Sequence, residues 1–152
     1  HMTITEKIKE ELKTAMKAKE AVKVSVLRGL LAGFVNENVT KGLKPETPVA
    51  DEMALAVIKR QAKQRQDSIE QFGKGGRQDL VEKETAELNI LKTYLPLEMT
   101  DEQIRKVVET KKAELGITDK AKIGQLIGAV MKELKGAADG AMVKKVVEEI
   151  LN

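Results

Sequence analysis

The sequence contains no cysteine, and its one histidine, His1, stands ahead of Met2 in the manner of a cloning remnant. Without cysteine the chain forms no disulfide bond and no thiolate metal site. Without an internal histidine, Ser-His triads, imidazole acid–base catalysis and histidine-containing zinc sites are excluded. The sequence therefore predicts no catalytic residue, no metal site and no cofactor.

Aromatic residues are also scarce, since only Phe34, Phe72 and Tyr94 occur in 152 residues. The core must then be built from aliphatic side chains. Such a core suits helix-on-helix packing, because β-sheets usually recruit aromatic and β-branched residues for their pleated faces. No segment alternates apolar and polar residues for long enough to predict a strand. The sequence predicts an all-α protein.

Long apolar runs are missing as well. No stretch approaches the ~18 apolar residues of a membrane span, and the first residues lack the apolar region of a signal peptide. Apolar residues make up 41% of the chain and charged residues 34%, with a mean hydropathy of −0.32. This composition excludes a membrane protein and is too apolar for a disordered one. Together with the absence of cysteine, it predicts a cytoplasmic protein with no membrane contact.

What the sequence does contain is helical periodicity. Apolar residues at helical spacing predict four helices before Pro96 and three short ones after it. Thr3 with Glu6, and Thr100 with Gln103, have the spacing of capping boxes that open a helix. The glycine-rich stretch 73–76 follows a helix rather than a strand, so it indicates a turn and not a phosphate-binding loop. We expect a bundle of about four helices over residues 1–97 and a three-helix domain over residues 98–152.

Basic residues cluster in two places. Residues 1–97 hold 17 Lys and Arg against 14 Asp and Glu, whereas residues 98–152 hold 10 of each. The first cluster, on the third predicted helix, consists of Lys59, Arg60 and Lys63. The second, at helix ends near the C-terminus, consists of Lys120, Lys122, Lys132, Lys135, Lys144 and Lys145. These residues are candidate contacts to RNA phosphates, and the alternative is ordinary solvated lysine at helix ends.

Two further pairs of residues break the pattern of their helices. Arg65 and Glu84 fall on the apolar faces of consecutive helices, where they can meet as a structural ion pair. The alternative is a functional pair with shifted pKa values. Gly124 and Gly128 have the spacing that allows close packing of one helix against another. The alternative for the glycines is the approach of a ligand to that face.

Several of these segments resemble the Yqey-like family in order and spacing. They are KQRQDSI at 63–69, GRQDL at 76–80 and the run 87–96. In the C-terminal part they are IG at 123–124, GAVMK at 128–132, KG at 135–136 and ADG at 138–140. Together they span the chain from about residue 25 to its end. The family is similar to the GatB tail, the last domain of one component of the glutamine-dependent aspartyl/glutamyl-tRNA amidotransferase.

The resemblance implies a helical domain with a smaller three-helix lobe and a role in contacting tRNA. It also implies a family-level description as a carbon–nitrogen ligase with glutamine as amido donor, although no residue matches the catalytic machinery of that enzyme. We therefore expect a tRNA-binding accessory module without catalysis of its own. The alternative is an adaptor that docks onto an aminoacyl-tRNA synthetase or an amidotransferase. The sequence does not give the oligomeric state.

Overall fold

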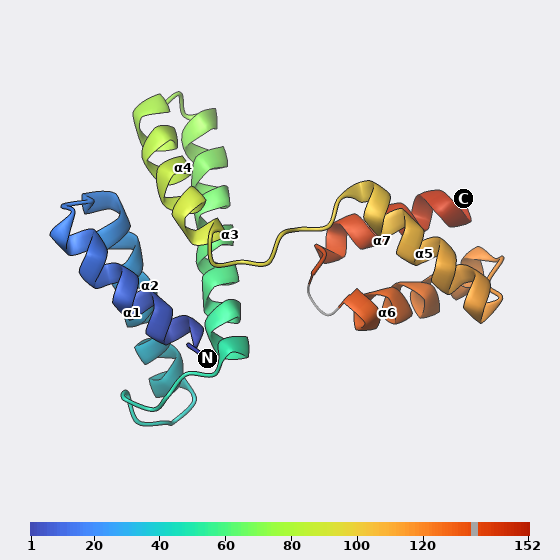
Figure 1. The fold of residues 1–152 in the computed structure, drawn as a ribbon. Helices are drawn as coiled ribbons and strands as arrows, with labels where there is room; N and C mark the ends of the chain where they lie inside the picture. Colours follow the sequence, from blue (N-terminus) through green and yellow to red (C-terminus); the bar gives the residue numbers. More distant parts are fainter. Residues whose placement is uncertain (135–136) are drawn as a thin grey trace. The chain divides into compact units, whose positions relative to one another are not determined.

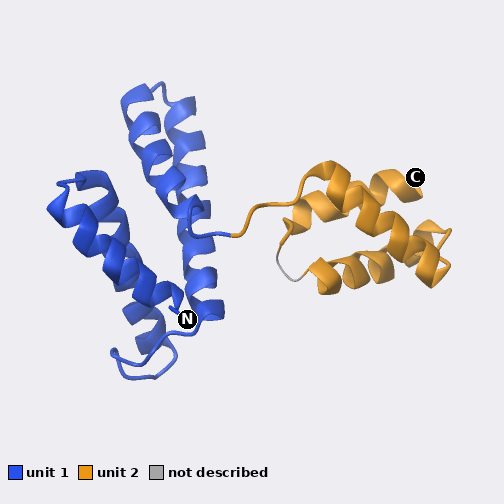
Figure 2. Ribbon diagram, viewed as in Figure 1, with its two compact units in different colours: residues 1–95 blue, residues 96–152 orange. Residues whose placement is uncertain are grey.

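The computed structural model describes residues 1–134 and 137–152, and within them it contains helices and no strand. The prediction of an all-α protein is confirmed. The chain divides into two compact units, unit 1 (His1–Leu95) and unit 2 (Pro96–Asn152), coloured separately in Figure 2. Among the helices that the structure describes, none has both the length and the apolar run that a membrane crossing requires.

Unit 1 is built from two helical hairpins (Figure 1). Helices α1 (Ile4–Lys17) and α2 (Ala21–Thr40) form the first, and α3 (Asp51–Lys74) and α4 (Gln78–Lys92) form the second. The turn between α3 and α4 contains Gly76 at a φ of 71°, a conformation that glycine adopts without steric cost. The glycine-rich stretch thus serves as the end of a helix and a turn.

Side-chain caps fix the beginning of α1. The backbone N–H of Glu6 donates to Thr3 Oγ1 at 3.1 Å, which satisfies one of the free donors of the first turn. The N–H of Ile4 donates to Asp51 Oδ1 at 2.9 Å. Since Asp51 begins α3, this second bond fastens the start of α1 to the start of α3.

The core of unit 1 is aliphatic with one phenylalanine. Its largest fully buried side chains are Ile8, Leu27, Leu30, Phe34, Ile58 and Leu91. They come from all four helices, so no hairpin buries its apolar face alone. Each such side chain contributes roughly 1.5–3 kcal/mol when removed from water.

Gly33 allows α2 to approach α3 closely. A Cβ atom at this position would lie 2.7 Å from Gln61 Nε2 and 3.0 Å from Val57 Cγ1. We expect Gly33→Ala to destabilise unit 1 by about 1 kcal/mol, because Val57 is buried and cannot move aside. Gly29→Ala, on the same helix with open space around it, should instead stabilise by about 1 kcal/mol. Urea unfolding of both variants checks this, and equal shifts would contradict the close approach.

Tyr94 joins the end of α4 to α1 through a hydrogen bond from its hydroxyl to Glu11 Oε2. Burial, and then the neighbouring Glu11 carboxylate, raise the pKa of Tyr94 above its ordinary value. Above about pH 10 the unfolded chain therefore loses the phenol proton before the folded chain does, and stability falls as the pH rises. We expect Tyr94→Phe to show a smaller loss between about pH 8 and about pH 11 in urea unfolding. Parallel losses in the two proteins would refute this role.

Unit 2 consists of α5 (Asp101–Leu115), the short 3-10 helix η1 (Lys120–Lys122), α6 (Ile123–Leu134) and α7 (Gly140–Leu151). The predicted capping box is present: Thr100 Oγ1 accepts from the Gln103 N–H at 3.2 Å, and Gln103 Oε1 accepts from the Thr100 N–H at 3.0 Å. Gly116 ends α5 at a φ of 64°. The buried core side chains include Ile104, Val108, Ile117, Leu126, Val130 and Val146.

Candidate nucleic-acid interface

Five of the lysines predicted to bind RNA are exposed on unit 2. They are Lys120, Lys122, Lys132, Lys144 and Lys145. None of the five side chains makes an ion pair or hydrogen bond within residues 1–134 and 137–152. Lys135, the sixth lysine of this predicted cluster, lies outside the described residues. The five charges are thus available to a ligand.

The five lysines do not form one cluster, because the helices separate them. Helices α6 and α7 run antiparallel (Figure 1), so Lys132 in the last turn of α6 lies at the same end as Lys144 near the start of α7. Lys120 and Lys122 come before α6 and lie at its other end. The two groups are about 18 Å apart, the length of a 12-residue helix. A ligand that meets both groups must be extended.

Two ion pairs to α5 show which sides of α6 and α7 remain open. Glu149 of α7 pairs with Arg105 of α5, and Glu133 of α6 lies 3.7 Å from Lys111 of α5. Lys144 is five residues before Glu149, and five residues along a helix turn a side chain by about 140°. Lys144 therefore projects from the side of α7 that faces away from α5.

The same reasoning applies to α6. Gly128 is five residues before Glu133 and so lies away from α5, in line with Gly124 and Lys132 at steps of four residues. A Cβ atom on Gly140, at the start of α7, would meet Met131 Cε at 3.5 Å, so the adjoining side of α6 faces α7. Gly124, Gly128, Lys132 and Lys144 thus share the outer side of the α6–α7 pair. We call them the lysine–glycine surface.

The prediction that Gly124 and Gly128 serve close helix packing is wrong within unit 2. Both glycines are exposed, and a Cβ atom added at either would meet nothing within 4 Å. The apolar side of α6 that packs into the core carries Leu126 and Val130 instead. The glycines leave a stretch of helix surface bare of side chains, with Lys132 one turn further on.

The acidic residues near this surface are few. Glu133 is engaged by Lys111, and Asp139 caps α7 by accepting from the Ala141 N–H at 3.2 Å. Asp119 similarly accepts from the Ala121 N–H at 2.9 Å. The two caps place carboxylates at the helix starts, so a phosphate gains little from backbone donors there. Glu148, one turn beyond Lys144, is the remaining acid on this side of α7.

The basic cluster on α3, in unit 1, is partly neutralised. Arg60 Nη2 lies 2.9 Å from Glu37 Oε2 on α2, which leaves this arginine with a partner from its own chain. Lys59 interacts with another group of the chain. Lys63 is exposed and makes no ion pair within the described residues. This cluster offers less free charge than the one in unit 2.

Arg65 and Glu84 lie together, with Arg65 Nη1 3.0 Å from Glu84 Oε2. Arg65 Nη1 also lies 3.4 Å from Glu87 Oε2, a partner that the residue pattern did not predict. Glu87 follows Glu84 by three residues, a spacing that puts both on one side of α4. The two carboxylates are 12% and 13% exposed and the arginine is 35% exposed, so the cluster joins α3 to α4 at the edge of the core.

Shifted pKa values in the described chain belong to scattered groups. A hydrogen bond from Arg77 lowers the pKa of Asp79, and a hydrogen bond to Glu114 raises the pKa of Lys111. With Tyr94 these groups lie on different elements and do not converge on one site. Within residues 1–134 and 137–152, no three acidic or histidine side chains gather in the manner of a metal site.

The whole fold belongs to one family. Residues 5–151 match the family described as Yqey-like protein, and the chain is a member of it. This confirms the resemblance that the sequence segments indicated.

Relatives with curated names share up to about a third of their residues with this chain. It is 33% identical to "Altered inheritance of mitochondria protein 41, mitochondrial" of Pyrenophora tritici-repentis over 95% of its length and 79% of the relative's. The protein of the same name from Lachancea thermotolerans is 31% identical over 94% and 66%. That from Saccharomyces cerevisiae strain YJM789 is 32% identical over 81% and 68%.

The prediction of a cytoplasmic protein is contradicted by these relatives, all of which are named as mitochondrial. Composition and the lack of cysteine did not distinguish one compartment with reduced thiols from another. The names of the relatives mention neither RNA nor an amidotransferase.

Proposed function

We propose that this protein binds tRNA through phosphate contacts at the lysine–glycine surface and has no catalysis of its own. The observation that carries the proposal is the charge of this surface. Residues 120–147 contain six lysines against two acids, Glu133 and Asp139. One of these acids is paired with a lysine of α5 and the other caps α7.

The bare glycine surface gives these lysines a ligand-sized approach. A nucleic-acid backbone is bulky and rigid, and side chains at Gly124 and Gly128 would hold it away from α6. Without them, phosphates reach the helix surface and the lysines on either side of it. Lysine binds phosphate as a point charge, so such contacts recognise the shape and charge of folded RNA rather than its sequence.

The scarcity of aromatic residues supports the same mode of binding. Proteins that read single-stranded RNA stack bases on aromatic side chains. Unit 2 contains no phenylalanine, tyrosine or tryptophan. The resemblance of the family to the tail of an enzyme that acts on tRNA favours tRNA over other structured RNAs.

A salt series of tRNA binding by the purified protein tests the proposal, with an RNA duplex of the same length as control. We expect tighter binding to tRNA than to the duplex. We also expect a log–log slope against salt of roughly −2 to −4, since each phosphate contact adds about −0.9. No binding of tRNA at low salt would refute the proposal.

A further inference from the structure

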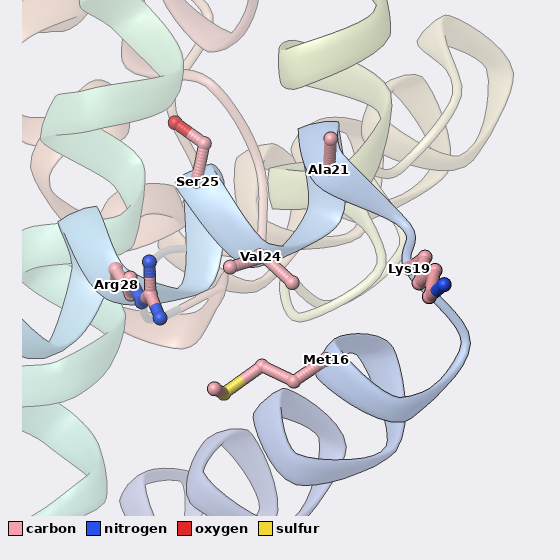
Figure 3. Close-up of a pocket in the computed structure, with 6 residues that line it drawn as sticks. All are labelled: Met16, Lys19, Ala21, Val24, Ser25 and Arg28. Carbon is pink, nitrogen blue, oxygen red and sulfur yellow. The ribbon is translucent and has the colours of Figure 1, made fainter.

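A cleft opens in unit 1 between the end of α1 and the beginning of α2. It has a volume of about 550 Å³ and is lined by Met16, Lys19, Ala21, Val24, Ser25 and Arg28. Figure 3 shows the side chains of Met16 and Val24 facing each other across the gap, with Lys19 and Arg28 at its two ends. The cleft therefore has an apolar floor between two cations.

The charge of the cleft is of one sign. No acidic side chain lines it. Neither Lys19 nor Arg28 makes an ion pair anywhere in the part of the chain that the structure describes. The other arginines of unit 1 do have a carboxylate partner: Arg60 pairs with Glu37, Arg65 with Glu84, and Arg77 with Asp79. Arg28 is the exception among them.

The backbone holds Lys19 at the cleft at a cost in stability. Its φ is 56°, in the left-handed region, and it is the one residue other than glycine found there in the described chain. The N–H of Lys19 donates to the Met16 carbonyl at 3.2 Å, and that of Glu20 donates to the Ala15 carbonyl at 3.0 Å. This is the hydrogen-bond pattern of a Schellman motif, which usually has glycine at this position. A lysine here costs about 1 kcal/mol relative to glycine.

The apolar floor is exposed to a degree unusual for its residue types. Met16 is 49% exposed, and Val22 beside the cleft is 44% exposed. A second hollow of about 430 Å³ shares Met16 and extends along α1 past Leu12 to Met2. The cleft thus continues as a shallow apolar groove, which suits the side chains of a macromolecule better than an enclosed small molecule.

We propose that this cleft docks an acidic amphipathic helix of a partner protein. Apolar side chains of the partner lie on Met16 and Val24, and its carboxylates pair with Lys19 and Arg28. Charge complementarity selects an acidic segment. A groove between two helices binds a third helix, whereas the described residues contain no strand to which an extended peptide adds an edge. This inference is independent of tRNA binding, which uses unit 2.

The test uses the full-length protein and a displayed library of helical peptides of 14 residues, the length of α1. Selection on the wild type should enrich peptides with apolar residues three and four apart, flanked by glutamate or aspartate. A synthetic copy of an enriched peptide should then shift the backbone NMR signals of Met16, Ala21 and Val24. Arg28→Glu should weaken its binding roughly 10-fold, and Lys44→Glu, on the loop after α2, should leave it unchanged.

Lys19→Gly provides a variant that cannot fail by unfolding. It should raise the stability of unit 1 and yet weaken the peptide roughly 2- to 5-fold, the value of one exposed ion pair. Failure to enrich any peptide, enrichment of basic or uncharged peptides, or equal affinity of Arg28→Glu would overturn the proposal. So would added tRNA that shifts the signals of Met16 and Val24, because the cleft would then belong to the RNA site.

Discussion

Reversing the charge of Lys132 and Lys144 together will weaken tRNA binding by roughly 10- to 100-fold at low salt. The two lysines lie on adjacent helices of the lysine–glycine surface, and neither has a partner in the described chain. Lys132→Glu with Lys144→Glu removes two phosphate contacts and adds two repulsions. Both side chains are exposed, so the fold of unit 2 is retained. Filter binding or fluorescence anisotropy at low salt measures the loss.

Two matched variants separate this surface from the net charge of the protein. Lys83→Glu with Lys92→Glu makes the same change on α4, where both lysines are exposed, and should change tRNA affinity far less. Glu148→Gln, one turn beyond Lys144, should tighten binding because it removes the nearest acid on that side of α7. Equal losses from the α4 pair and the unit 2 pair would mean that the lysine–glycine surface is not the site.

Replacing Arg65 by methionine will destabilise unit 1 by about 1–3 kcal/mol. The guanidinium lies between Glu84 and Glu87, and both carboxylates are largely removed from water. Without Arg65 they face each other with no cation to balance them, which is costlier than losing the pair altogether. The partial exposure of Arg65 keeps the effect below that of a fully buried pair. Urea unfolding followed by circular dichroism gives the change in the free energy of unfolding.

The rescue variant decides between this explanation and simple loss of packing. Arg65→Met combined with Glu84→Gln and Glu87→Gln removes all three charges and should recover most of the lost stability. If the triple variant is no more stable than Arg65→Met alone, the carboxylates are not the cause. The tRNA affinity of both variants should equal that of the wild type, because the cluster is in unit 1.

The helices could be predicted from the sequence because their signals are local. Spacing of apolar residues gives the helical stripe, and Thr100 with Gln103 gave one helix start that the structure reproduces in both of its hydrogen bonds. The family could also be recognised, since short segments such as 63–69 and 128–132 keep their order and spacing. Such features depend on residues within a few turns of one another.

The arrangement of the candidate site could not be predicted, because it depends on which side of each helix meets its neighbours. The spacing of Gly124 and Gly128 is the same for a packed face and a bare one, and only the ion pairs to α5 show that it is bare. Sequence likewise counted Arg60 as a free cation, although Glu37 on another helix neutralises it. Glu87 was overlooked because it was not needed to complete a pair with Arg65.

Binding of tRNA to the lysine–glycine surface can be followed directly in the amide NMR signals of the full-length protein. Glycine amides appear in a well-separated part of the spectrum, so Gly124 and Gly128 report on the surface itself, while Gly29 and Gly33 report on unit 1. On addition of tRNA at low salt, we predict shifts or broadening at Gly124 and Gly128 that disappear as salt is raised, with Gly29 and Gly33 little changed. Shifts confined to unit 1, or no change at Gly124 and Gly128 at any salt concentration, would contradict binding at this surface.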